Sequence, residues 1–377
     1  MRIRPPSPAL FRRRAAVLAG AALTAVAVWP GVPAGADTEL RLNQIQVVGS
    51  HNSYHLEPSA REFALVSLFA GDQAGAWQYS HRPLGEQLAG QRVRQIELDL
   101  YADPDGGMYA RPLIRTLTGQ PAEYDPRMRE PGTKVLHVAG LDYRSNCLKL
   151  VDCLAAVRDW SRADPGHVPV AILLEFKDSL PVGDLSIPLV TWTRDRILAV
   201  EQEIRSVFGA GDLITPDTVR DPGRTLEQSV REGGWPTLAE SRGKVMFLMD
   251  NTGVHRDRYV EGNPSLEGRL MFTSSEPGRP DAAFVKRNDP APAIRDLVAQ
   301  GYLVRTRADA DTLEARSGDT ARRDAALASG AQWVSTDYPA PGMSARWGTD
   351  YHVSLPNGAA ARCNPVTAPV TCTISTP

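Results

Sequence analysis

Residues 93–100 read VRQIELDL, a short β-type run that ends in acidic side chains. Seven similar runs occur along the chain, and longer helical patterns separate most of them. The eight predicted strands are QIQVVGS (44–50), VRQIELDL (93–100), KVLHVA (134–139), VPVAILLEF (168–176), KVMFLMD (244–250), RLMFTSS (269–275), YLVRTR (302–307) and WVSTDY (333–338). Eight strands alternating with helices predict an α/β fold, a closed (β/α)8 barrel of the TIM type. The rival fold, an open doubly wound sheet, usually carries a glycine-rich phosphate loop at its first turn, and the sequence has none there.

The helical patterns between these runs are clear in some connections and weak in others. Helices are predicted at 83–91, 148–163, 189–208, 225–232, 292–300 and 320–329. The connection after Phe272 carries no clear helix.

Polar side chains gather where the predicted strands end. In a parallel barrel the carboxyl ends of the strands converge on the active-site face. Strand side chains alternate between faces, so Glu97 and Asp99 share one face, as do Glu175 and Lys177. The residues that this argument brings together are His51, Asn52, Glu97, Asp99, His137, Glu175, Lys177, Arg305, Arg307 and Asp337.

The acidic members of this set predict a metal site. Glu97, Asp99 and Glu175 in one barrel mouth would repel one another strongly unless a cation lay between them. Flexible coordination by several carboxylates favours Ca²⁺ over Mg²⁺, and Asn52 can add a neutral oxygen. Each acid taken singly could instead cap a turn or form an ion pair.

His51 and His137 are the candidate acid and base, because an imidazole titrates near neutral pH. The other five histidines fall in loop-like segments and are interpreted as structural. They are His55, His81, His167, His255 and His352.

Two motifs around these residues resemble the calcium-dependent phosphatidylinositol-specific phospholipases C. Residues 50–54, SHNSY, are similar to the Ser-His-Asn-Thr-Tyr motif of that superfamily, and VRQIELD (93–99) is similar to its Val-Glu-Leu-Asp strand. Residues 137–143 and 305–309 have counterparts in a bacterial secreted branch, and the similarity covers about residues 40–340. The resemblance implies a phospholipase C-like barrel in which Asn52, Glu97, Asp99 and Glu175 bind Ca²⁺. It also implies that His51 and His137 form the catalytic pair.

The reaction implied by the resemblance is cleavage of phosphatidylinositol to diacylglycerol and an inositol cyclic phosphate. The inositol 2-hydroxyl would attack its own phosphate, with His137 as acid and either His51 or Glu97 as base. Unphosphorylated phosphatidylinositol is the expected substrate. Lys177, Arg305, Arg307 and Tyr338 are the candidate substrate contacts.

Barrel closure gives Asp337 a role in this set. The last predicted strand pairs with the first, so Asp337 is expected within hydrogen-bonding distance of a His51 nitrogen and would fix its tautomer. The alternative is that Asp337 caps the turn at Tyr338-Pro339.

Other functions remain open at this point. A glycerophosphodiesterase uses the same barrel, but its resemblance predicts His-Arg-Gly where this chain has His51-Asn52-Ser53. A sphingomyelinase D-like enzyme is a more distant variant. An inactive secreted barrel that binds lipids or glycans belongs to a different class, and it would have no need of both histidines and all four ligands.

Residues 1–36 are interpreted as a secretory signal peptide. Arg2, Arg4 and residues 12–14 precede the apolar run AAVLAGAALTAVAVW (15–29), and Ala34-Gly35-Ala36 is a cleavage site. The alternative is an uncleaved anchor, for which the run is short. The rest of the chain is expected to form a catalytic barrel (37–341) and a disulfide-stapled tail (342–377) packed on it.

The protein is expected to be an exported monomer whose phospholipid substrate lies at a membrane surface. The formal net charge is −2, which argues against a nucleic-acid partner because such a partner needs a basic face. Four cysteines suit an oxidising compartment. The two local pairings, Cys147–Cys153 and Cys363–Cys372, close the shortest loops and are expected.

Overall fold

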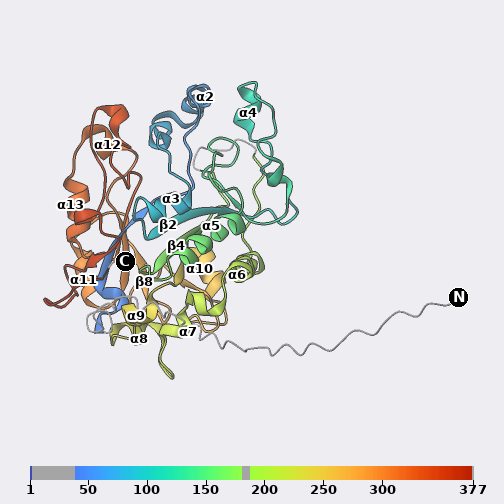
Figure 1. Ribbon diagram of the computed structural model, residues 1–377. Coiled ribbons are helices and arrows are strands. Elements are labelled where there is room, and N and C mark those ends of the chain that lie inside the picture. Colours follow the sequence, from blue (N-terminus) through green and yellow to red (C-terminus); the bar gives the residue numbers. More distant parts are fainter. Residues whose placement is uncertain (2–38, 181–186, 376–377) are drawn as a thin grey trace. The chain divides into compact units, whose positions relative to one another are not determined.

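Eight parallel strands form the wall of a barrel in the described part of the chain, each beside the next one in sequence. The computed structural model describes Met1, residues 39–180 and residues 187–375, so the predicted signal peptide lies outside the described residues beyond Met1. The barrel strands are β1 (Ile45–Ser50), β2 (Gln95–Tyr101), β4 (Val170–Phe176), β6 (Val245–Met249), β7 (Met271–Thr273), β8 (Phe284–Lys286), β9 (Leu303–Arg307) and β10 (Trp333–Thr336). Figure 1 shows the strands at the centre with helices arranged around them.

The sheet closes on itself, which confirms the predicted TIM-type barrel. β10 pairs in parallel with β1 from Val47↔Trp333 to Ser50↔Thr336. In the described chain, β7 and β8 meet through the parallel bridge Ser274↔Phe284. The seam of the barrel therefore lies between its two shortest strands. A short strand, β5 (Leu213–Ile214), lies beside the start of β6.

Helices cover the outside of the barrel and its carboxyl end. They are α2 (Ala60–Ala70), α3 (Leu84–Ala89), α4 (Leu113–Leu117), α5 (Leu150–Ala163), α6 (Arg194–Val207), α7 (Pro216–Val219), α8 (Leu226–Arg231), α9 (Leu238–Ser241), α10 (Gly253–Val260), α11 (Ala293–Ala299), α12 (Leu313–Ser317) and α13 (Ala321–Ala328). The 3₁₀ helices are η1 (Leu42–Gln44), η2 (Gly71–Trp77), η3 (Pro126–Arg129), η4 (Ala210–Asp212), η5 (Ala345–Trp347) and η6 (Pro356–Gly358). The six predicted helices are confirmed as α3, α5, α6, α8, α11 and α13. The connection between β7 and β8 has no helix, also as predicted.

Helix α5 illustrates why these segments pack on the barrel. Leu150, Leu154 and Val157 recur at helical spacing and are fully buried, whereas Asp152 and Asp159 are exposed. This apolar stripe faces the core, where α5 packs between α3 and α6.

The predicted third strand, residues 134–139, is wrong as a barrel strand. A strand there, β3, spans Lys134–Val135 and pairs antiparallel with the end of β2. Lys134 is held by a buried ion pair with Asp103 at 2.9 Å. After β3 the chain turns away from β2. In this tight turn Val138 and Asp142 exchange backbone hydrogen bonds. The barrel position belongs to β8, whose three residues are too few to show an alternating pattern.

The loops at the carboxyl ends of the strands are long and carry their own helices. α2 follows β1, α4 follows β2, and α12 follows β9. Figure 1 shows these three helices projecting at the same end of the barrel. Both predicted disulfides are confirmed, Cys147–Cys153 and Cys363–Cys372. Near the second of them, β11 (Arg362–Cys363) pairs antiparallel with the start of β1.

Candidate active site

Three acidic side chains meet at the carboxyl end of the barrel. Glu97 and Asp99 project from β2 and Glu175 from β4, and their ligand oxygens lie within 4.8 Å of one another. Asp99 and Glu175 are neighbours in the strand register. Among the described residues, Asn52 Oδ1 and Asp99 Oδ1 are buried without a hydrogen-bond partner. Orphaned oxygens beside clustered carboxylates are the donor set that a Ca²⁺ ion requires, so these residues fit that ion.

In the absence of a cation, burial disfavours the charged form of two of the three acids. Burial raises the pKa of Glu97 to about 7, against the opposing pull of Arg305. Burial likewise raises the pKa of Asp99 well above its ordinary value, although Lys177 opposes it. Glu175 is the exception, because Lys177 and Lys286 outweigh burial and lower its pKa. A bound cation would stabilise all three carboxylates in their charged form.

His51 is held by a carboxylate across the closing pair of strands. Its backbone N–H donates to Thr336 O at 2.9 Å, and its Nδ1 lies 2.8 Å from Asp337 Oδ1. Arg307 donates to the other oxygen of Asp337 at 3.2 Å. The predicted contact between Asp337 and His51 is therefore confirmed. Burial lowers the pKa of His51 well below its ordinary value, so a neutral ring can donate from Nδ1 and accept a proton at Nε2.

His137 is held by a carboxylate from its own turn. Its Nδ1 lies 2.7 Å from Asp142 Oδ2, and the same oxygen lies 2.8 Å from His55 Nε2. The other nitrogen of His55 faces the carbonyl of Tyr79 at 3.0 Å. Both nitrogens of His55 thus face acceptors, which favours the imidazolium. Burial opposes that charge, but Asp142 outweighs burial and raises the pKa of His55.

The turn that returns Asp142 to His137 depends on glycine. Gly140 has φ +79°, and a Cβ there would lie 2.5 Å from Ile187 Cδ1. Neither the backbone conformation nor the space suits a side chain. Burial lowers the pKa of His137, and the hydrogen bond that its ring donates to Asp142 acts in the opposite direction.

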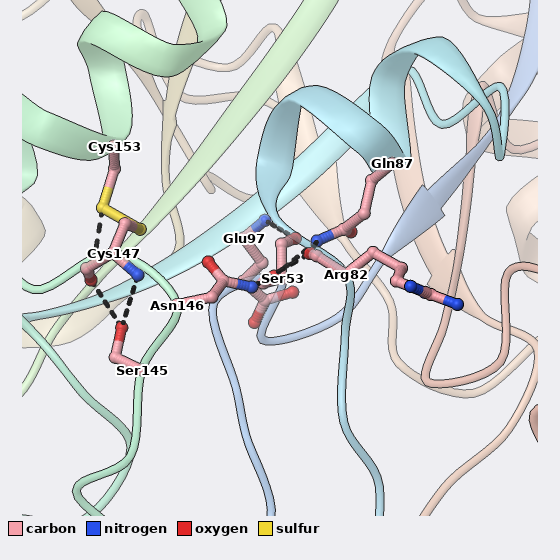
Figure 2. Close-up of a disulfide and its surroundings, with 8 residues drawn as sticks. All are labelled: Ser53, Arg82, Gln87, Glu97, Ser145, Asn146, Cys147 and Cys153. Carbon is pink, nitrogen blue, oxygen red and sulfur yellow. Dashed lines mark hydrogen bonds between the residues drawn. A yellow bond between two sulfur atoms is a disulfide. The ribbon is translucent and has the colours of Figure 1, made fainter.

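A hydrogen-bond network fixes the loop that carries Asn52 (Figure 2). Ser53 Oγ accepts from the Glu97 backbone N–H at 2.8 Å, and Gln87 Nε2 donates to Ser53 O at 2.7 Å. Asn146 Nδ2 also reaches Ser53 O, at 3.3 Å. Asn146 directly precedes the Cys147–Cys153 disulfide. Its hydrogen bond to Ser53 therefore links the disulfide-bonded segment to the loop that carries Asn52.

A pocket of about 210 Å³ lies over these groups. Eight of the predicted site residues line it, namely His51, Asn52, Asp99, His137, Glu175, Lys177, Arg307 and Asp337. Lys177 Nζ lies 3.2 Å from both Asp99 and Glu175. Its wall also includes Ala76, Trp77 and Tyr79, from the segment after β1, and Asp311, from the loop after β9.

Three other predicted residues lie behind this pocket or beside it. Glu97 is buried, with Oε1 3.9 Å from His51 Nε2. Arg305 donates to Glu97 at 2.5 Å and to Asn288 at 2.5 Å, so its guanidinium is occupied by the protein. Tyr338 packs edge-on against Trp347 and lines a separate hollow.

Sequence reasoning missed several groups at this site. Asp250 lies at the end of a predicted strand, which is the signal that identified Glu97 and Asp99, but the sequence analysis assigns it no role. In the structure it forms an ion pair with Lys286 beside the acidic cluster. Asp142 has no signal from strand periodicity because it lies in a turn. His55 has the structural contacts expected of it, but they support His137. His81 likewise donates to the carbonyl of His51 at 2.8 Å.

Comparison with known proteins identifies the family. The model of the family described as "Phosphoinositide phospholipase C, Ca2+-dependent" matches residues 40–365. The chain belongs to this family. It is therefore a phosphodiesterase of the phosphoinositide phospholipase C type, and its cofactor is Ca²⁺.

Solved structures of the family share the fold. A calcium-dependent phosphoinositol-specific phospholipase C from a Pseudomonas species is 18% identical with a TM-score of 0.51, and the match covers 87% of this chain and 97% of that one. The same Pseudomonas enzyme has been solved as a myo-inositol complex, also with a TM-score of 0.51, 18% identity, and coverage of 87% and 96%. The phosphatidylinositol-specific enzyme from Streptomyces antibioticus is 17% identical with a TM-score of 0.50, over 80% of this chain and 95% of that one. No curated protein matches the chain.

Within residues 39–180 and 187–375, none of the helices has the length and apolar content needed to cross a bilayer.

Proposed function

We propose that this protein is a secreted phosphatidylinositol-specific phospholipase C that forms diacylglycerol and an inositol cyclic phosphate with two catalytic histidines. The observation that carries this proposal is the pair of histidine–carboxylate contacts, His51–Asp337 and His137–Asp142, facing one pocket beside the acidic cluster. A binding protein would need neither pair. The myo-inositol in the Pseudomonas structure supports an inositol head group.

His51 is the proposed general base. Asp337 fixes the tautomer in which Nδ1 donates, so Nε2 can accept the proton of the inositol 2-hydroxyl as that oxygen attacks the phosphorus. Glu97 is the competing base, but its Oε2 is held by Arg305, and its other oxygen is suited to a cation. Because nucleophile and phosphate belong to one molecule, positioning supplies much of the acceleration.

His137 is the proposed general acid. As the bond from phosphorus to the glycerol oxygen breaks, Nε2 of His137 passes its proton to that oxygen, while Asp142 holds the ring through Nδ1. The anionic phosphate would favour the imidazolium form that this step needs. Product formation leaves His51 protonated and His137 neutral, the reverse of the starting state.

The remaining residues neutralise the phosphate. Asn52, Glu97, Asp99 and Glu175 would hold Ca²⁺, which supplies a positive charge that stabilises the phosphate oxygens and the attacking oxygen. Arg307 and Lys177 line the pocket and are the proposed protein contacts to the phosphate. Arg305 instead positions Glu97.

A substrate panel tests the proposed function. The purified protein would be assayed on phosphatidylinositol, lysophospholipids, sphingomyelin and glycerophosphodiesters, with and without a chelator. Calcium-dependent cleavage of phosphatidylinositol above the others supports the proposal. Preference for a glycerophosphodiester or for a lysophospholipid would support one of the related enzymes on the same barrel.

Asp337→Asn is expected to lower the maximal rate by about tenfold or more while calcium affinity and thermal stability stay unchanged. The asparagine keeps the shape of the side chain but removes the charge that stabilises the His51 imidazolium. Steady-state kinetics, calcium titration and thermal melting would measure the three quantities. Normal turnover in the variant would mean that His51 is oriented by another group.

Exposed apolar side chains around the barrel mouth support docking on a membrane surface. Leu68 and Phe69 on α2, Leu117 on α4 and Leu313 on α12 are exposed by 77, 41, 48 and 60%. All four lie on the loops at the carboxyl ends of the strands, and we call them the rim. The double variant Leu68→Ser/Leu117→Ser is expected to lose vesicle binding about tenfold or more, because each leucine contributes apolar area.

Vesicle sedimentation with phosphatidylinositol-containing vesicles would measure this loss. Val370→Gln is the matched control, since Val370 is fully exposed in the carboxyl-terminal segment and lies off the rim. Equal binding by the double variant and the control would refute docking through the rim.

Export is proposed on the two disulfides and on the sequence of residues 1–36. Amino-terminal sequencing of secreted protein is expected to begin at Asp37. The catalytic unit is proposed to span residues 37–341, with residues 342–377 as a tail packed on it.

A further inference from the structure

A second hollow, larger than the catalytic pocket, lies beside it. It has a volume of about 720 Å³ and runs between the α2–η2 segment and α12. That volume is within the range of roughly 300–1,000 Å³ that is usual for small-molecule sites. We call it the α2–α12 groove.

The groove adjoins the catalytic pocket and shares a wall with it. Ala76, Trp77 and Asp311 line both hollows. The ring of Trp77 lies edge-on to His137, with 5.5 Å between ring centroids. The groove is therefore the space that adjoins the catalytic pocket on the Trp77 side of His137.

The two walls of the groove are tied together. Thr312 Oγ1 donates to Gly75 O at 3.1 Å, and Arg316 Nη2 donates to Gln78 Oε1 at 2.6 Å. Asp311 and Thr312 have φ values of +54° and +62°. A left-handed conformation is unfavourable for a β-branched residue, so the contacts across the groove must outweigh it.

The lining of the groove combines apolar and polar groups. Phe63 on α2 and Leu313 on α12 provide apolar surface. Gln73 adds an amide to the lining, Asp72 and Asp311 add carboxylates, and Arg316 is hydrogen-bonded to Gly75 and Gln78. An acyl glycerol has this composition, with ester oxygens close to methylene chains.

We infer that the α2–α12 groove binds the diacylglycerol half of the substrate, namely its glycerol backbone and the first part of an acyl chain. The inference rests on the proposed function, in which His137 protonates the glycerol oxygen. That oxygen must then lie at His137, and the groove is the adjoining space on its Trp77 side. Leu68 and Leu313 at the outer end would meet the bilayer, where the rest of the chain stays.

Two variants test the groove without disturbing the catalytic residues. Leu313→Gln removes apolar wall, and Ser67→Phe adds bulk on the α2 side. Val370→Gln is the control with an equivalent loss of exposed apolar surface elsewhere. Thermal melting would establish that each variant is folded.

The assay compares two soluble substrates, so that membrane docking plays no part. One is a short-chain diacyl phosphatidylinositol below its micelle concentration, and the other is glycerophosphoinositol, which has no acyl chains. Both groove variants are expected to lose about tenfold in kcat/KM on the acylated substrate and to keep wild-type kcat/KM on the other, because they lose binding to the acyl part. The control should match wild type on both.

Two results would overturn the inference. One is an equal loss on both substrates, which would indicate a disturbed catalytic pocket. The other is an unchanged rate on the acylated substrate. Failure of the proposed function is distinguishable from either, because the wild-type protein would then release no inositol cyclic phosphate from the short-chain phosphatidylinositol.

Discussion

Removal of divalent cations with a chelator is expected to abolish turnover, and added Ca²⁺ should restore it better than Mg²⁺. Glu97, Asp99 and Glu175 lie within 4.8 Å of one another. Without a cation, burial raises the pKa of both Glu97 and Asp99, which disfavours their charged forms. Without its ion, the cluster cannot supply the positive charge that stabilises the phosphate in the transition state. Full activity in chelator would contradict a catalytic role for a metal ion at this site.

The variant Asp99→Asn tests the calcium site at a single residue. Calcium binding should weaken markedly while the fold persists, because the substitution removes one charge from a repulsive cluster. Calorimetric titration with Ca²⁺ measures the affinity, and thermal melting in chelator measures the fold. We expect the melting temperature in chelator to stay equal or rise. A large fall would indicate that Asp99 is structural.

The second large effect is expected from His137→Ala, which should lower kcat on phosphatidylinositol by about 10²- to 10⁴-fold. The glycerol oxygen is a poor leaving group unless it receives a proton, and His137 is the proposed donor. An inositol phosphodiester with p-nitrophenol as leaving group needs no such proton. The variant should therefore cleave the p-nitrophenyl substrate at close to the wild-type rate.

Asp142→Asn provides the matched test of how His137 is held. The asparagine keeps the size of the side chain but removes the charge that orients both His137 and His55. It should reproduce part of the His137→Ala loss on phosphatidylinositol and little of it on the p-nitrophenyl substrate. Equal losses on both substrates in either variant would contradict the acid role.

The sequence predicted those parts of the site that strand periodicity determines. Glu97, Asp99 and Glu175 could be brought together because alternate side chains share a face and parallel strands end at one edge. Barrel closure likewise predicted that Asp337 contacts His51, and Asp337 Oδ1 lies 2.8 Å from His51 Nδ1. The eight-strand pattern was right in number, but residues 134–139 were taken for a barrel strand in place of β8. An apolar run is the same signal in a barrel and in a loop that packs on its own small core.

The missing parts depend on turns and long-range contacts. Asp142 reaches His137 through a tight turn that Gly140 permits, and His55 reaches Asp142 from the loop after β1. Arg305 shares a face with Arg307, as predicted, but its guanidinium donates a hydrogen bond to Glu97. Alternation gives the face of a side chain but not its partner, and the partner decides which arginine meets the substrate.

The most direct test of the central claim is ³¹P NMR of phosphatidylinositol incubated with the purified protein and Ca²⁺. A cyclic five-membered phosphate resonates well downfield of acyclic phosphates, so attack by the inositol 2-hydroxyl can be read from the product. The account predicts that the inositol 1,2-cyclic phosphate signal appears first, and that it is absent with chelator or with the His137→Ala variant. Phosphatidic acid as the product, an acyclic inositol phosphate with no cyclic precursor, or a cyclic product formed equally well in chelator would contradict it.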